Sequence, residues 1–255
     1  MPETGPIIGV IPARYGSTRF PGKPLALIAG KPMIQHVHEM TSRAHLLSRV
    51  IVATDDERIR RAVEVFGGEV MMTSAEHRSG TDRVAEVAGR LEAPYYINVQ
   101  GDEPLIDPRL VDRCAEMLLE GAPMATLVTR IAARSGLFDQ NVVKVVVTKD
   151  CHAMYFSRHA IPFPKKYLDR GADIDLEAST YFRHVGTYGY SRAALLEITQ
   201  APPCETEELE SLEQLRALFL GIKIEVAVVD SRSPCVDVPA DIAKVENLLS
   251  MRGTA

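Results

Sequence analysis

Residues 49–72, RVIVATDDERIRRAVEVFGGEVMM, contain a strand, a helix and a second strand in direct succession. The opening run RVIVA is apolar and β-branched, which favours a buried strand, and Thr54-Asp55-Asp56 can cap a helix at 57–66. Gly67-Gly68 ends that helix before the strand at 69–72. With links this short, the helix crosses over to a parallel neighbouring strand, so the segment predicts an α/β fold.

The same alternation continues on both sides of this segment. Strands are expected at 7–11 and 95–99, and helices from Pro32 onward, at 81–91 and at about 108–119. The later chain shows strand-like runs at 124–131, 142–148, 181–190 and 222–229, a loop at 163–178, and helices at 207–220 and 239–251. In the helix at 207–220, the side chains expected on one buried face are Leu209, Leu212, Leu215 and Phe219.

We therefore expect a single domain over residues 1–255, with a mainly parallel, Rossmann-like sheet and helices on both of its faces. A smaller lobe is expected as an insertion at about 130–205, because strand–helix alternation becomes irregular there.

Composition argues against several classes of protein. The 255 residues carry a net charge of -5 without a basic run, so no nucleic-acid partner is expected. The four cysteines show no C-x-x-C spacing, so we expect neither a zinc site nor a redox motif nor a disulfide framework. The sequence has no signal-peptide pattern and no apolar stretch of about 18 residues. A cytoplasmic protein that does not enter a membrane is expected.

The loop at 11–24, IPARYGSTRFPGKP, follows the first strand and collects groups that bind phosphate. Its two glycines permit close approach of the backbone to an anion. Arg14, Arg19 and Lys23 supply cations that would stabilise charge on a leaving pyrophosphate. The alternative is a solvated basic loop. Because ligands of parallel sheets bind beyond the carboxyl ends of the strands, the position favours a phosphate site.

Two further strings carry candidate site residues. In Gln100-Gly101-Asp102-Glu103-Pro104, an Asp at the end of a strand suits Mg²⁺, which takes one or two protein carboxylates together with phosphate oxygens. Asp102 is the expected ligand. Glu103 could compete for the ion, although its place next to Asp102 in the chain would point its side chain away from the site. The alternative for the whole string is an ordinary turn between a strand and a helix. The string HRSGTDR at 77–83 opens a helix, where it either caps the helix or offers N–H and hydroxyl groups to a ligand.

These strings resemble, in sequence and in order, those of the 3-deoxy-manno-octulosonate (KDO) cytidylyltransferases among the sugar nucleotidyltransferases. The first loop is similar to the family pattern I-P-A-R-x-x-S-x-R-L-P-x-K-P-L, with Phe20 in place of Leu. The resemblance implies that Arg14 and Lys23 hold the phosphates of CTP. The nucleotide contacts that it implies come from Ala13, Arg14, Lys23, Arg78, Ser79, Gly80 and Gln100.

The second metal ligand is also implied by the resemblance. CVDVPAD at 235–241 is similar to the family's G-V-D-T-P-E-D, which makes Asp237 the partner of Asp102 on Mg²⁺. Three positions depart from that pattern, namely Cys235, Val238 and Ala240. The alternative for Asp237 is a helix N-cap before Pro239.

The sugar site is expected in the second half of the chain. SRHAIP at 157–162, RHVGTYGY at 183–190 and ESLEQLR at 210–216 resemble family strings. The sugar-binding residues that the resemblance implies are Arg158, His184, Tyr188, Glu213 and Gln214. Arg158 would clamp the carboxylate of a keto-acid sugar. For each of these residues, an ordinary structural role is the alternative.

The resemblance implies transfer of CMP from CTP to the anomeric hydroxyl of KDO, with release of pyrophosphate, in lipopolysaccharide biosynthesis. It also implies dependence on Mg²⁺ and a homodimer built on the second-half lobe. Alternatives are a cytidylyltransferase for an 8-amino or sialic-acid-like sugar, a non-catalytic nucleotide-binding module, and a glycosyltransferase. The loop at 18–21 argues against a sialic-acid-like sugar, whereas an 8-amino variant of KDO would use nearly the same pocket. The acidic residues at both expected metal positions argue against a non-catalytic module, and the absence of D-x-D after Val99 argues against a glycosyltransferase.

Overall fold

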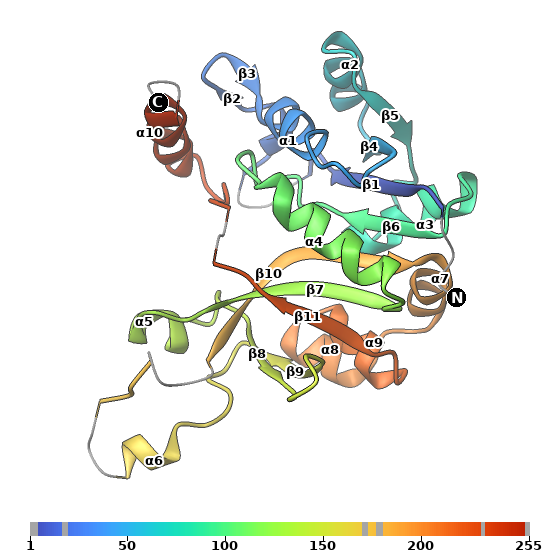
Figure 1. The fold of residues 1–255 in the computed structure, drawn as a ribbon. Coiled ribbons are helices and arrows are strands. Elements are labelled where there is room, and N and C mark those ends of the chain that lie inside the picture. The colour runs from blue at the N-terminus through green and yellow to red at the C-terminus, as the bar shows by residue number, and fades with distance from the viewer. Residues whose placement is uncertain (1–4, 17–19, 170–172, 177–180, 231–232, 253–255) are drawn as a thin grey trace.

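The computed structural model describes residues 5–16, 20–169, 173–176, 181–230 and 233–252. Its large sheet is built from β1 (Ile7–Ala13), β4 (Arg49–Thr54), β5 (Glu69–Met72), β6 (Tyr95–Asn98), β7 (Met124–Arg130), β8 (Lys144–Val147), β9 (Ala153–Ser157), β10 (Phe182–Ser191) and β11 (Ile224–Val228). The strand order is β11-β7-β10-β6-β1-β4-β5, with β8 and β9 added beside β10 (Figure 1). A small hairpin, β2 (Leu27–Ile28) and β3 (Lys31–Pro32), lies apart from this sheet.

The direction of the strands confirms a mainly parallel central sheet. β6, β1, β4 and β5 are mutually parallel, and β11 runs parallel to β7. β10 lies between β6 and β7 and is antiparallel to both. The carboxyl ends of β1, β6 and β7 therefore meet at one edge, where the amino end of β10 also lies.

Helices cover both faces of the sheet, as expected. One apolar layer packs under α1 (Met33–Thr41), α2 (Glu57–Val65) and α4 (Pro108–Leu119). The other packs under α3 (Gly80–Arg90), α7 (Arg192–Gln200) and α9 (Gln214–Phe219). Figure 1 shows α1 and α4 on one side of the strands and α7 and α9 on the other. None of the helices in the described part of the chain has the length and apolar composition needed to cross a membrane.

The predicted helix at 207–220 is wrong, because the chain breaks it at Ser211. The segment forms α8 (Glu205–Glu210) and α9, and Ser211 between them has a left-handed φ of 51°. The Glu210 carboxylate accepts hydrogen bonds from Ser157 Oγ (2.6 Å) and the Arg158 N–H (2.9 Å), which fixes the end of α8 against β9. As a result Leu209 is 77% exposed and Phe219 73% exposed, whereas Leu212 and Leu215 are buried.

Part of the segment expected as a lobe, at 130–205, packs with the main body. β10 and α7 belong to the central sheet and its helical layer, because their apolar side chains pack into the main core. What stands apart is a separate small cluster of Ile131, Leu137, Val142, Ala160, Ile174 and Tyr181. It includes α5 (Arg134–Phe138), while α6 (Lys165–Leu168) lies within the segment expected to be a loop and extends away from the body (Figure 1).

The C-terminal segment returns to the N-terminal third of the chain. α10 (Asp241–Arg252) contributes Val245 to a cluster with Val236, Ile28, Met33 and Leu105. This packing places the residues that precede α10 beside the loops after β1 and β6.

Candidate functional site

The loops after β1 and β6 meet in a pocket of about 360 Å³. We call it the cationic pocket, and its lining includes Ala13, Arg14, Lys23, Arg78, Ser79, Gly80, Arg83, Gln100, Asp102 and Asp237. Gly101 permits the close approach of the loop after β6 to the end of β1, because a Cβ there would lie only 2.7 Å from the Pro12 carbonyl oxygen. The structure thus brings all the residues expected at the nucleotide and the metal into one pocket. Ser17, Thr18 and Arg19 of the first loop lie outside the described residues.

Lys23 lies between the two expected metal ligands. Its Nζ donates to Asp102 Oδ2 at 2.7 Å and to the Val236 carbonyl oxygen at 2.9 Å, and lies 3.9 Å from Asp237 Oδ1. Ligand atoms of Asp102, Asp237 and Cys235 are all within 4.8 Å of one another. The cluster therefore already holds one positive charge and can offer oxygen ligands to a metal ion.

The N-cap alternative for Asp237 is wrong. α10 begins at Asp241, whose Oδ2 accepts the N–H groups of Asp237 and Val238 at 3.1 Å each. A hydrogen bond from Lys244 and these two N–H groups lower the pKa of Asp241 to about 2. The helix therefore begins four positions after Asp237, whose Oδ1 lies 3.9 Å from Lys23 Nζ in the cation cluster.

Glu103 does not compete with Asp102. It is 8% exposed and does not line the cationic pocket. Burial, together with the charge of Asp102, raises the pKa of Glu103 to about 8. The position of Glu103 confirms that its side chain points away from the cationic pocket, as expected for the residue next to Asp102.

The start of α3 serves as both a cap and a pocket wall. Ser79 is the N-cap and forms a reciprocal capping box with Asp82. Both Ser79 and Gly80 also line the cationic pocket, so capping is confirmed and their contact with a nucleotide stays a prediction. Arg83, one turn further, is buried and lies 3.5 Å from Asp55, and its position in the pocket wall was not anticipated.

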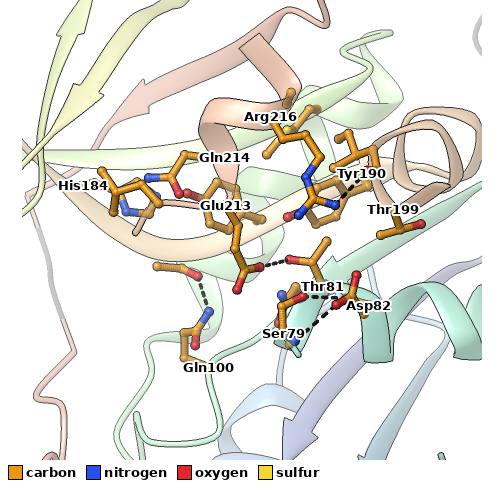
Figure 2. Close-up of a pocket in the computed structure, with 18 of the residues that line it drawn as sticks. Ser79, Thr81, Asp82, Gln100, His184, Tyr190, Thr199, Glu213, Gln214 and Arg216 are labelled. Atoms are coloured by element: carbon orange, nitrogen blue, oxygen red, sulfur yellow. Dashed lines mark hydrogen bonds between the residues drawn. The ribbon is translucent and has the colours of Figure 1, made fainter. Parts of the chain in front are cut away.

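A second pocket, of about 230 Å³, opens beside the first. We call it the aromatic pocket, and its lining includes Asn98, His184, Tyr188, Tyr190, Gln214 and Arg216. Ser79, Gly80, Gln100 and Glu213 line both pockets, so the two are continuous. Gln100 is oriented by donating Nε2–H to the Gly186 carbonyl oxygen at 2.8 Å (Figure 2).

His184 is neutral in this pocket. Burial, aided by the charge of Arg183, lowers the pKa of His184 to about 3. Its Nε2 lies 2.9 Å from Thr126 Oγ1, and that hydroxyl has only one proton, which the Thr187 carbonyl oxygen accepts at 2.9 Å. The hydroxyl therefore accepts from Nε2–H, and His184 Nδ1 remains a hydrogen-bond acceptor.

Glu213 and Tyr188 supply further polar groups. Glu213 Oε2 accepts from Thr81 Oγ1 at 2.9 Å, and Figure 2 shows the two side chains facing one another across the pocket. Desolvation by surrounding protein raises the pKa of Glu213 against that hydrogen bond. The Tyr188 hydroxyl is buried and has no hydrogen-bond partner among the described residues. An unpaired buried hydroxyl costs roughly 1–3 kcal/mol, which a ligand hydroxyl could offset.

Arg158 is not part of either pocket. Its guanidinium donates to the main-chain carbonyl oxygens of Glu210 (2.7 Å), Gln140 (3.1 Å) and Ser211 (3.2 Å). These bonds tie β9 to the break between α8 and α9, and neither pocket has Arg158 in its lining. These contacts favour a structural role for Arg158, and its expected contact with a sugar carboxylate stays a prediction.

Sequence reasoning missed Asn98, Thr81 and Tyr190. Asn98 is 3% exposed, and its Oδ1 has no partner among the residues described. It stands two positions before Gln100, so strand alternation could have placed both side chains on one face. Thr81 and Tyr190 lie within strings that the sequence did single out, beside the residues chosen from them.

Comparison with known proteins agrees with this geometry. Residues 8–224 match the family model described as cytidylyltransferase. The 3-deoxy-manno-octulosonate cytidylyltransferase of Trichlorobacter lovleyi is 49% identical over 94% of this chain and 97% of its own length. That of Marinobacter nauticus is 50% identical over 96% and 97%.

Two solved structures extend the comparison. A CMP:2-keto-3-deoxy-manno-octonic acid synthetase complexed with CTP superposes with a TM-score of 0.89 and 44% identity, over 97% of this chain and 99% of the other. A 4-diphosphocytidyl-2C-methyl-D-erythritol synthase from Anaerococcus prevotii shares the fold, with a TM-score of 0.61, 11% identity and 96% coverage of both chains. The chain belongs to the cytidylyltransferase family and, within it, to the 3-deoxy-manno-octulosonate cytidylyltransferases.

Proposed function

We propose that this chain transfers CMP from CTP to the anomeric hydroxyl of KDO and releases pyrophosphate. The observation that carries the proposal is the continuity of the two pockets, one with Arg14, Lys23 and Arg78 in its lining and the other with His184, Tyr188 and Gln214. A nucleotide and a sugar bound in them would meet at the shared wall of Ser79, Gly80, Gln100 and Glu213. The relatives named above, with about half of their residues identical to this chain, supply the identity of the two substrates.

The phosphate side of the reaction falls to Arg14 and Lys23. Both line the cationic pocket, and their charges would stabilise the pyrophosphate that leaves as the sugar oxygen attacks the α-phosphorus. The nucleoside would lie along Ala13, Arg78, Ser79, Gly80 and Gln100, where N–H groups and hydroxyls are available. No covalent intermediate on the protein is needed, so positioning and charge supply most of the rate.

Mg²⁺ is the metal we propose, and the residues fit it. Asp102 and Asp237 already accept a cation, the Lys23 ammonium, between them. These two carboxylates would hold the ion, which when bound offsets the charge of the phosphate oxygens.

The sugar side falls to His184, Tyr188, Glu213 and Gln214. His184 Nδ1 is an acceptor for a sugar hydroxyl, and the Tyr188 hydroxyl is buried in the same wall. Because His184 is neutral, it cannot clamp the sugar carboxylate as a charge. Arg216 also lines this pocket, but its guanidinium is engaged with the Glu207 carboxylate.

We further propose a cytoplasmic homodimer that acts in lipopolysaccharide biosynthesis, as the resemblance implies. Support for a dimer comes from exposed apolar side chains in the second half of the chain: Phe163 is 63% exposed, Met154 59% and Phe138 46%. Sedimentation equilibrium would measure the mass, and a monomer at micromolar concentration would contradict this part of the proposal.

The test of the proposed function is pyrophosphate release with CTP or UTP and a panel of acidic sugars. Cytosine presents a donor where uracil presents an acceptor, and mismatched buried groups cost several kcal/mol, so kcat/KM should be at least about 100-fold higher with CTP. KDO should be the preferred acceptor over sialic acid. Equal kcat/KM for the two nucleotides, or no release with KDO, would refute the proposal.

A further inference from the structure

Cys235 stands at the cation cluster, where the family string has glycine. Its Sγ lies within 4.8 Å of the ligand oxygens of both Asp102 and Asp237. The residue is exposed, so an ion in solution can reach it.

The main chain of Val236 fixes Cys235 at this place. The Val236 N–H donates to the Asp102 carbonyl oxygen at 2.9 Å, and the Val236 carbonyl accepts from Lys23 Nζ. The Val236 side chain is fully buried in the cluster beneath α10. Cys235 and Asp237 flank this anchored residue, and both present their ligand atoms to Asp102.

The three ligand atoms differ in chemistry from a plain Mg²⁺ site. Mg²⁺ takes oxygen ligands and has little affinity for sulfur, whereas Zn²⁺ and Cd²⁺ accept thiolate together with carboxylate. With bonds of about 2.3 Å to sulfur and about 2.1 Å to oxygen, ligand atoms around one Zn²⁺ lie roughly 3.6 Å apart. Rotation of the side chains that moves their ligand atoms by about 1 Å would bring the observed cluster to that spacing.

We propose that Cys235 makes this cluster a mixed carboxylate–thiolate site, which binds thiophilic divalent ions of the Zn²⁺ and Cd²⁺ class through Asp102, Asp237 and Cys235. The ion displaces the Lys23 ammonium from Asp102, and the thiol proton passes to solvent as the metal–sulfur bond forms. Such an ion occupies the carboxylates proposed above for Mg²⁺ and would therefore inhibit CMP transfer. This inhibition rests on the proposed function, whereas binding of the ion does not.

Cd²⁺ titration of the full chain tests the inference, because thiolate-to-Cd²⁺ charge transfer absorbs in the ultraviolet. The wild type should develop this band and saturate at one ion per chain. Cys235→Ser should lose the band and bind Cd²⁺ at least about tenfold more weakly. Cys151→Ser is the matched control, because Cys151 is also exposed but lies outside the cluster, and it should behave as the wild type.

A second measurement uses the unmodified protein and so does not depend on how a variant folds. Cd²⁺ should slow alkylation of Cys235 by iodoacetamide at least about tenfold, read by mass spectrometry, while Cys151 alkylates at an unchanged rate. The inference is overturned by a band that persists in Cys235→Ser, by no band in the wild type, or by equal protection of both cysteines. Turnover with CTP, KDO and Mg²⁺ is measured separately, so its failure would remove the proposed function and leave the binding result standing.

Discussion

Replacing Gly101 with alanine tests whether the close approach of the loop after β6 to the end of β1 sets the position of Asp102. The added Cβ would lie 2.7 Å from the Pro12 carbonyl oxygen. Carbon–oxygen contacts in proteins are rarely closer than about 3.3 Å, so either this loop or the end of β1 must move by about 0.6 Å. Both partners are main chain or rigidly attached to it, so no side-chain rotation can relieve the contact.

The displacement falls directly on a proposed metal ligand. Misplacement of reacting groups by about 1 Å can cost about 100-fold in rate, so Gly101→Ala should lower kcat by roughly tenfold. Overpacking should also lower the free energy of unfolding by about 1–3 kcal/mol. The assay is pyrophosphate release at saturating CTP and KDO, with denaturant unfolding of the same samples.

Gly89→Ala is the matched control. Gly89 lies in α3, and a Cβ there meets no atom within 4 Å. Alanine in a helix is favoured by about 0.5–1 kcal/mol, so this variant should be slightly more stable and fully active. Wild-type kcat in folded Gly101→Ala, or an equal loss in Gly89→Ala, would refute the reasoning.

Three further predictions concern single residues. Asp102→Asn should lower turnover at least about 100-fold at limiting Mg²⁺, because it removes the charge of a metal ligand, while CTP binding weakens less. Near-normal turnover of this variant would contradict the assignment of Asp102 as a metal ligand. Arg158→Lys should lose about 1.5–3 kcal/mol of stability with an unchanged KM for KDO, because three main-chain carbonyls lose their partner; a raised KM alone would restore the sugar clamp. The pKa of His184 is about 3 in the folded state, below its unfolded value near 6.5. The contribution of neutral His184 to the free energy of unfolding is therefore full above about pH 6.5 and falls as the pH drops toward 3. Between about pH 7.5 and about pH 5 the wild type should lose about 2 kcal/mol that His184→Gln does not, and equal losses in denaturant unfolding would contradict this.

Local patterns predicted the first half of the fold well. The helix at 108–119 and the strand at 69–72 have the bounds expected, because capping residues, glycines and apolar periodicity all agree there. The loops after β1 and β6 were predicted as site loops for a topological reason, since parallel neighbours end at one edge. That reasoning needs only the strand order near the start of the chain.

The second half shows where local patterns fail. The spacing of Leu209, Leu212, Leu215 and Phe219 fits one helix, yet the helix breaks at Ser211. The Glu210 carboxylate there accepts hydrogen bonds from Ser157, the last residue of β9, and from Arg158, which follows it. The insertion of β10 between β6 and β7 is likewise a pairing of distant segments, which no short window of sequence contains. The contacts of Arg158 could not be predicted for the same reason, because its three acceptors are carbonyl oxygens of other segments.

The contact of Lys23 with the Val236 carbonyl joins groups 213 positions apart in the sequence. Residues 233–252 follow all the strands of the sheet along the chain, so there is a stage of synthesis at which the strands have been made and these residues have not. A nascent chain at that stage has the loops that collect phosphate but only one of the two carboxylates that would hold Mg²⁺. The packing of Val236 and Val245 against Ile28, Met33 and Leu105 therefore joins the two proposed metal ligands only once the C-terminal segment has been made.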